Sequence, residues 1–178
     1  AAQAGVDGLI AVGGGAGGHA GTINPFALIE DIKSFWDKTI LLGGCINKGN
    51  QVRAAQLMGA DLAYVGTRFI NTVESRAPQG HKDLIVASKS TDIIHTPAVT
   101  GVPSNFIKQS LENSGYDMKA LLNPGDVNFG SKLTPEGSDS SKAWQDVWSA
   151  GHGAGGIDDI PSCDELIDQM IKEYRAAQ

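Results

Sequence analysis

The first group that could do chemistry is a single imidazole inside a glycine-rich loop. His19 lies in residues 13–21, GGGAGGHAG, which directly follow the apolar run 8–12. Glycines let the main chain approach a flat or anionic ligand closely. Histidine is the only side chain of this run that exchanges a proton near neutral pH. Because the flanking glycines expose it, we expect His19 to act as a general base rather than only to hydrogen-bond its own loop.

Two further glycine loops favour phosphate. Gly43 and Gly44 follow one apolar run, and Gly66 and Thr67 follow the next. Backbone N–H groups at neighbouring strand ends can bind a phosphate, and the Thr67 hydroxyl is a further donor. Tight turns that need a positive φ are the alternative explanation of the same glycines. We predict that these four residues contact a phosphate.

Each of the remaining polar candidates has either a role in the ligand site or a structural role. Arg68 either adds charge to the phosphate site or pairs with Glu74. His152 lies in a second glycine-rich loop, residues 150–156, from which it could reach the site, although a structural role is favoured. No metal site is predicted, because no acidic pair has a third ligand nearby. The following residues are predicted to be structural: His81, His95, Trp144, Trp148, Asp158 and Asp159.

Repeated strand and helix units must position these loops. The predicted strands are residues 9–12, 39–42 and 62–65, and the predicted helices between them are residues 25–36 and 50–58. Asn24 and Pro25 suit an N-cap and a first helical position, and Gly59 suits a helix stop. Continuous apolar strands that alternate with helices indicate parallel βαβ units with both sheet faces covered. Ligands bind at the carboxyl ends of such strands, so the three glycine loops should share one rim.

The second half of the chain has a different pattern. Helices are predicted at residues 77–88, 105–114, 143–149 and 163–174, with a long loop at 124–141. The last helix should bury an apolar face of Leu166, Ile167, Met170 and Ile171. We divide the chain into residues 1–75, which supply strands, and residues 76–178, a helical and loop segment that covers the site. Residues 1–5 have the pattern of a helix end stopped by glycine, so we expect upstream sequence in the complete protein.

Composition excludes several classes of function. Of the 178 residues, 41% are hydrophobic and 19% charged, as in soluble globular proteins. A net charge of −6 provides no basic surface for nucleic acid. No signal peptide or transmembrane run is evident, so no membrane partner is expected. Cys45 and Cys163 lack metal-ligand spacing, and we expect them to be reduced thiols in the cytoplasm.

A dinucleotide site is disfavoured. Gly13, Gly15 and Gly18 match G-x-G-x-x-G after a strand. In a dinucleotide fold a helix would start within the motif, and an acidic residue would end the next strand. Here the helix begins only near Pro25, and the next strand ends in glycine.

Together these residues resemble the nitronate monooxygenase family, formerly called 2-nitropropane dioxygenases. Its members are flavin-dependent barrels, related to FMN-containing enoyl-acyl-carrier-protein reductases and to NAD(P)H:quinone reductases. The resemblance covers nearly the whole chain and rests on residues 15–21 (GAGGHAG), 42–44 (LGG), 58–70 (MGAD to GTRFI) and 148–151 (WSAG). Many relatives carry an acidic residue shortly before the A-G-G-H element, whereas this chain has three glycines there.

The resemblance implies a (β/α)₈ TIM barrel that binds FMN without a covalent link. His19 is similar to the family's catalytic histidine, and Gly17 and Gly18 would lie beside the flavin. Gly43, Gly44, Gly66 and Thr67 are similar to its FMN-phosphate contacts. The implied reaction is oxidation of alkyl nitronates by O₂, in which the nitronate reduces the flavin and O₂ reoxidises it. The alternatives are an NAD(P)H-dependent reductase of quinones or enoyl thioesters, and a non-catalytic phosphate- or nucleotide-binding module.

The chain has only the last three strand units of such a barrel. An eight-unit barrel typically needs about 250 residues. We therefore expect the N-terminal half to be a missing segment or a separate chain, and we leave a homo-oligomer open.

Overall fold

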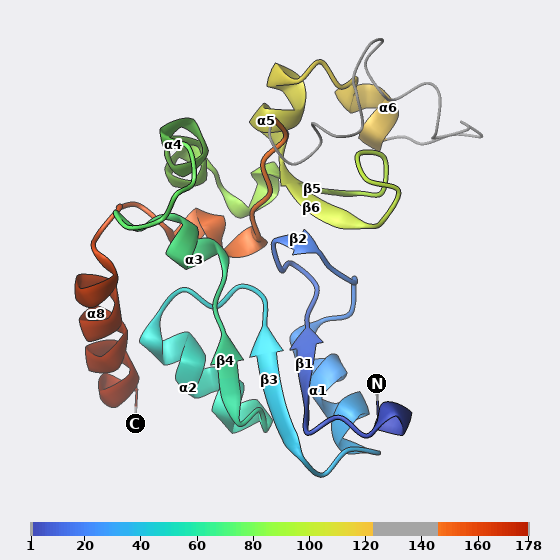
Figure 1. The fold of residues 1–178 in the computed structure, drawn as a ribbon, viewed down its shortest axis with the longest axis vertical. Helices are drawn as coiled ribbons and strands as arrows, with labels where there is room; N and C mark the ends of the chain where they lie inside the picture. The colour runs from blue at the N-terminus through green and yellow to red at the C-terminus, as the bar shows by residue number, and fades with distance from the viewer. Residues whose placement is uncertain (1, 123–145, 178) are drawn as a thin grey trace.

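The protein is built around two small sheets that meet near its centre (Figure 1). The structure, a computed structural model, describes residues 2–122 and 146–177. The first sheet is parallel, in the order β1-β3-β4: β1 (Gly8–Val12), β3 (Thr39–Gly43) and β4 (Leu62–Tyr64). Figure 1 shows the three arrows pointing the same way, toward the second sheet. The predicted parallel α/β units are confirmed.

Two helices connect these strands and pack on one face of the sheet. They are α1 (Pro25–Lys33) and α2 (Gly49–Met58). The Asn24 side chain accepts the N–H of Phe26 at 3.0 Å, and Gly59, at φ 107°, ends α2, so the predicted cap and stop are confirmed. Buried residues of strands and helices form one core between them: Ala11, Ile29, Trp36, Ile40, Leu42, Ile46, Ala55 and Ala60.

The opposite face of the parallel sheet is apolar and exposed. Ile10 and Val12 on β1 are 53% and 40% exposed, and Leu62 and Tyr64 on β4 are each 54% exposed. These residues alternate with the core residues, as the period of two in a strand requires. The prediction that both faces are covered is therefore wrong for the described residues. A closed eight-stranded barrel is likewise not formed by the strands that the structure describes.

The second sheet is antiparallel, in the order β2-β6-β5: β2 (Gly18–His19), β6 (Ser104–Ile107) and β5 (Ile93–Thr96). A helix starting at residue 105 was predicted, and this is wrong because the helix α5 (Lys108–Asn113) begins three residues later. Phe106 and Ile107 are fully buried in the hairpin with β5. A short apolar run is compatible with either element, and here strand pairing decides.

The remaining elements lie around the two sheets (Figure 1). They are η1 (Ala2–Ala4), α3 (Thr67–Ile70), α4 (Gln79–Ala87), η2 (Ser90–Asp92), α6 (Met118–Leu122), η4 (His152–Gly156) and α8 (Cys163–Ala176). The predicted loop at 124–141 and Trp144 lie outside the described residues. Residues 146–148 are not helical, so this part of the helix predicted at 143–149 is wrong. No helix in the described part of the chain is long and apolar enough to cross a membrane.

Helix α8 brings the end of the chain back against α2 (Figure 1). The Glu173 carboxylate accepts the N–H of Gly49 at 2.8 Å, at the first position of α2. Leu166 is buried and Met170 is half-buried, but Ile167 and Ile171 are 46% and 41% exposed, so the predicted apolar face is wrong for Ile167 and Ile171. The division of the chain into residues 1–75 and 76–178 stays a prediction. The hydrogen bond between Gly49 and Glu173 joins the two parts.

Replacing Gly49 with alanine should destabilise the protein. A methyl group there would overlap backbone atoms of Met170 and Tyr174, which cannot move without displacing α8. We expect Gly49→Ala to lower the free energy of unfolding by about 1–3 kcal/mol, the usual cost of overpacking. The exposed neighbour provides the control, since Asn50→Ala should change it by less than about 0.5 kcal/mol. Equal urea midpoints for the two variants would contradict the packing of α8 on α2.

Candidate functional site

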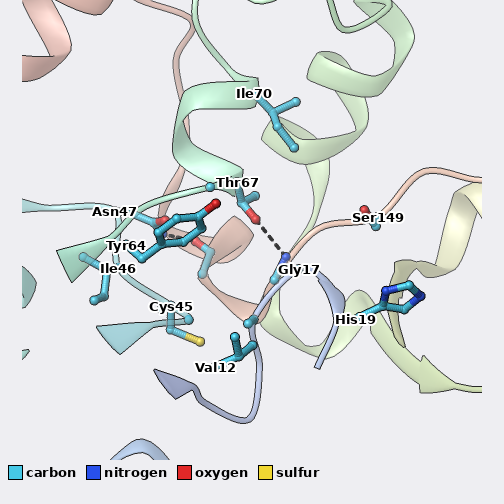
Figure 2. Close-up of a pocket in the computed structure, with 16 residues that line it drawn as sticks. Val12, Gly17, His19, Cys45, Ile46, Asn47, Tyr64, Thr67, Ile70 and Ser149 are labelled. Atoms are coloured by element: carbon cyan, nitrogen blue, oxygen red, sulfur yellow. Dashed lines mark hydrogen bonds between the residues drawn. The ribbon is translucent and has the colours of Figure 1, made fainter. Parts of the chain in front are cut away.

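A cavity of about 330 Å³ lies at the carboxyl ends of the parallel strands, where the two sheets meet. Its lining residues come from the loops after β1, β3 and β4 and from residues 149–153: Val12, Ala16, Gly17, His19, Gly43, Gly44, Cys45, Ile46, Asn47, Tyr64, Gly66, Thr67, Ile70, Ser149, Gly151 and Gly153. The structure thus brings together every predicted site residue except Gly18. Figure 2 shows His19 at one end of this cavity and Tyr64 and Asn47 at the other.

The backbone of residues 151–153 forms a hydrogen bond with each of the three strand-end loops. The Gly151 N–H donates to Thr67 Oγ1 at 3.0 Å, after β4. The His152 N–H donates to the Gly15 carbonyl at 2.8 Å, after β1. The Gly153 carbonyl accepts a hydrogen bond from the Asn47 side chain, after β3. One short segment therefore fixes the spacing of three loops that are far apart in sequence.

Two of the glycines are required by this packing. A methyl group on Gly17 would lie 2.8 Å from the Gly151 nitrogen and 2.9 Å from Thr67 Oγ1. A methyl group on Gly151 would lie 2.5 Å from the Gly15 carbonyl oxygen. None of these three distances is tolerable for a Cβ atom, so packing within the protein explains why Gly17 and Gly151 are glycines.

Gly66 is different, because nothing lies within 4 Å of a methyl group placed on it. Its φ of −112° is also open to any residue. Gly66 precedes α3, whose first N–H groups have no intrahelical acceptor. Among the described residues no other backbone group accepts the N–H of Gly66 or Thr67. The Thr67 hydroxyl oxygen accepts from Gly151, and its O–H stays able to donate into the cavity.

The electrostatics of the cavity suit an anion. None of the described residues that line it is an aspartate or a glutamate. The lining residues carry backbone N–H groups, the hydroxyls of Thr67, Ser149 and Tyr64, the Asn47 amide, the Cys45 thiol and the His19 imidazole. An open position beside N–H donors fits a phosphate monoester, which accepts several hydrogen bonds through its oxygens.

His19 is exposed on the two-residue strand β2. It lies opposite Ser104 of β6, and Gly18 before it has a φ of 70°, which favours glycine. A methyl group on Gly18 would meet nothing within 4 Å. Strand pairing therefore holds the imidazole at the edge of the cavity, with open space beside it.

Comparisons with known proteins identify the family of this chain. The family model of nitronate monooxygenase matches residues 1–173. The chain belongs to the nitronate monooxygenase family. Members of this family are flavin-dependent oxidoreductases.

Individual relatives are similar over most of this chain. The "probable nitronate monooxygenase" of Staphylococcus saprophyticus is 29% identical over 83% of the chain and 45% of that protein. An octahydroindene-carboxyl-CoA dehydrogenase of Rhodococcus jostii is 26% identical over 95% of the chain and 59% of that protein. The solved nitroalkane oxidase of Streptomyces ansochromogenes matches with a TM-score of 0.75 and 25% identity, over 99% of the chain and 54% of that structure. The chain spans about half the length of the proteins that it matches.

Arg68, in the G-T-R-F element that suggested the nitronate monooxygenase family, is not a cavity residue. Its side chain is buried and pairs with Asp159 at 2.5 Å, so of the two alternatives left open for Arg68 the pairing with Glu74 is wrong. Glu74 instead accepts the N–H of Cys163 at the start of α8, and this bond lowers the pKa of the Glu74 carboxyl. Arg68 therefore anchors the segment that leads into α8.

Several lining residues were not predicted as site residues: Cys45, Asn47, Tyr64, Ser149, Gly151 and Gly153. The glycine pattern at 150–156 was the available signal for the last two. Cys45 follows Gly44 and has a φ of 57°, rare for a residue with a side chain. Burial raises the pKa of the Cys45 thiol, so it is protonated at neutral pH and is a poor nucleophile.

His81 supports the site from α4. Its ring stacks on Trp148 with centroids 5.4 Å apart, and its Nε2 is 2.9 Å from the Ser149 carbonyl oxygen. This contact holds the chain just before Gly151. The prediction that His81 is structural agrees with this placement.

Stability should fall with acidification because of His81. Burial lowers the pKa of the His81 imidazole below its ordinary value of 6.5. The unfolded chain therefore binds the proton more readily, and the stabilisation is present above about pH 6.5 and is lost as the pH falls through the lower folded value. We expect urea unfolding between about pH 7.5 and pH 5.5 to show a smaller loss of stability for His81→Phe, which keeps a ring against Trp148, than for the wild type. An equal loss in both proteins would show that His81 does not contribute.

Proposed function

We propose that the protein binds FMN at the strand-end cavity and oxidises alkyl nitronates with O₂. The observation that carries this proposal is the open position at Gly66, beside the N–H groups of Gly66 and Thr67, for which the described residues supply no acceptor, in a cavity that His19 also lines. Membership of the nitronate monooxygenase family supports a flavin as the occupant. A flavin with a terminal phosphate matches the anion-binding character of the loops.

The phosphate would be held by Gly43, Gly44, Gly66 and Thr67. The start of α3 would supply its first N–H groups, which have no intrahelical acceptor. The Thr67 O–H would donate to a phosphate oxygen while its oxygen keeps the bond from Gly151. Gly17 and Gly18 would lie beside the ring system, where the bare backbone allows close approach.

His19 would act on the substrate at the other end of the cavity. It would take the α-proton from a neutral nitroalkane, or it would hold the negative charge of a nitronate that is already ionised. When bound, the flavin supplies the redox chemistry, taking electrons from the substrate and passing them to O₂. The protein contributes position, charge stabilisation and a proton acceptor.

The exposed apolar face of the parallel sheet supports a larger barrel. Ile10, Val12, Leu62 and Tyr64 would be buried if further strands closed a (β/α)₈ barrel around them. We propose that these strands belong to another part of the same protein or to a second chain. We also propose that residues 76–178 cover the site and that the protein is cytoplasmic, where Cys45 and Cys163 stay reduced.

A second candidate function is the reduction or dehydrogenation of an acyl thioester. The name of the Rhodococcus jostii relative identifies a coenzyme A thioester as the substrate of that protein. Such an enzyme would use the same flavin cavity and would need room for a long thioester, with NAD(P)H as the electron donor in the case of an enoyl reductase.

Anaerobic mixing of the intact flavoprotein with each reductant separates these functions. We expect propionate 3-nitronate to bleach the flavin absorbance between about 350 and 500 nm, and NADPH to leave it unchanged. Rapid bleaching by NADPH alone would favour the reductase. A protein that purifies without flavin and takes up none would favour a non-catalytic phosphate-binding module.

His19→Ala should separate catalysis from cofactor binding. We expect flavin content to be retained and turnover of neutral nitroalkanes to fall by about 100-fold or more, the usual contribution of a general base. The measurement is O₂ consumption at matched flavin concentration. Unchanged turnover would refute the proposed role of His19.

Gly66→Ala should weaken FMN binding without destabilising the fold. The new methyl group meets no protein atom, but it would occupy the space proposed for the phosphate. We expect an FMN affinity at least about tenfold lower, and a free energy of unfolding of the apoprotein within about 0.5 kcal/mol of the wild type. Gly21→Ala is the matched control, since a methyl group there also meets nothing and Gly21 does not line the cavity. Equal FMN affinity in both variants would place the phosphate elsewhere.

A further inference from the structure

A second hollow adjoins the strand-end cavity at His19. This groove has a volume of about 420 Å³ and shares Val12 and His19 with the first cavity. Its lining residues are Val12, His19, Ala20, Gly21, Thr22, His95, Val102 and Pro103. Among these described residues the two imidazoles are the only titratable side chains. The groove therefore combines an apolar wall with two nitrogen heterocycles and no carboxylate.

Asn105 fixes the orientation of the His95 ring. Asn105 is 1% exposed, and its side-chain N–H₂ donates to the Ala16 carbonyl at 2.6 Å. A carbonyl can only accept, so the amide oxygen of Asn105 must face His95, whose Nδ1 lies 3.0 Å away. His95 Nδ1 must then carry the hydrogen. The ring is thereby held with Nε2 directed away from Asn105.

The sheet places this imidazole beside the proposed catalytic strand. Gly18, Asn105 and His95 occupy one row across β2, β6 and β5; these three strands lie side by side in Figure 1. Gly18 has no side chain, so β2 leaves this row uncovered at its end, whereas His19 pairs with Ser104 in the neighbouring row. His95 is exposed, and no described group is hydrogen-bonded to its Nε2. In the cationic ring, Nε2–H can donate to a carboxylate. In the neutral ring, whose hydrogen is on Nδ1, Nε2 can only accept from a protonated carboxylic acid.

We propose that this groove binds a carboxylate on the tail of the substrate, with His95 Nε2 as its direct contact and Asn105 as the residue that positions the ring. The inference rests on the proposed function, because the reacting carbon of the substrate is placed at His19. A short nitronate with a terminal carboxylate would extend from His19 along the apolar wall to His95. A nitronate with a plain alkyl tail would make no polar contact there.

A matched pair of substrates tests this proposal in the intact flavoprotein. Propionate 3-nitronate and propyl-1-nitronate have the same carbon chain and differ in the terminal carboxylate. We expect His95→Leu to raise KM about tenfold for the carboxylated nitronate and less than about twofold for the alkyl one, with kcat little changed. His95→Gln, which keeps an N–H donor near the position of Nε2, should recover part of the loss. Thr91→Ala, at an exposed position just before β5, is the control and should leave both KM values unchanged.

Other outcomes overturn the proposal. Equal effects of His95→Leu on both substrates would indicate a structural role, and unchanged KM values would exclude the contact. Long-range ¹H–¹⁵N spectra supply a readout besides activity, since neutral His95 should be the Nδ1–H tautomer in the wild type. An Nε2–H tautomer would contradict the role of Asn105.

Failure of the proposed function would be recognised separately, as a wild type that oxidises neither nitronate. Binding of propionate then tests the groove without turnover. Saturable shifts of the His95 ring resonances with propionate, but not with 1-propanol, would support the carboxylate site. The absence of such shifts would overturn it.

Discussion

The structure depends on three backbone contacts that residues 151–153 make with the loops after β1, β3 and β4. Each parallel strand is followed by a glycine within two residues, and bare loops of this kind have little that fixes their relative positions. Gly151, His152 and Gly153 connect them through one N–H to Thr67, one N–H to Gly15 and one carbonyl to Asn47. The cavity is therefore assembled by a segment more than eighty residues downstream of Thr67. Stacking of His81 on Trp148 supports that segment from outside.

The glycines of the site fall into two physical classes. Gly17 and Gly151 are glycines because neighbouring backbone leaves no room for a Cβ atom. Gly66 has both room and an ordinary φ, so packing among the described residues does not require glycine there. The proposed phosphate, which would approach this backbone closely, would account for the glycine. The parallel sheet that ends at these loops also has one exposed face. The apolar side chains on that face are typical of a surface covered by other strands.

Sequence patterns predicted the parallel half of the fold well and the antiparallel half poorly. Local signals sufficed for α1 and α2, where Asn24, Pro25 and Gly59 mark the helix ends. The strand β6 was missed because its short apolar run also suits a helix, and only pairing with β5 distinguishes them. Likewise, Arg68 pairs with Asp159 across ninety-one positions of sequence, a contact that spacing cannot reveal. The glycine loops were placed on one rim from strand order alone, whereas the groove at His95 depends on the unpredicted sheet.

The central claim is that the strand-end loops hold the phosphate of a flavin. Comparing FMN with riboflavin tests it most directly, because the two ligands differ only in that phosphate. Titration of the intact apoprotein by flavin fluorescence should give an affinity for FMN at least about 100-fold higher than for riboflavin, the value of two or more charge-assisted hydrogen bonds. Equal affinities would contradict the account, since they would show that the loops around Gly66 and Thr67 do not bind the phosphate.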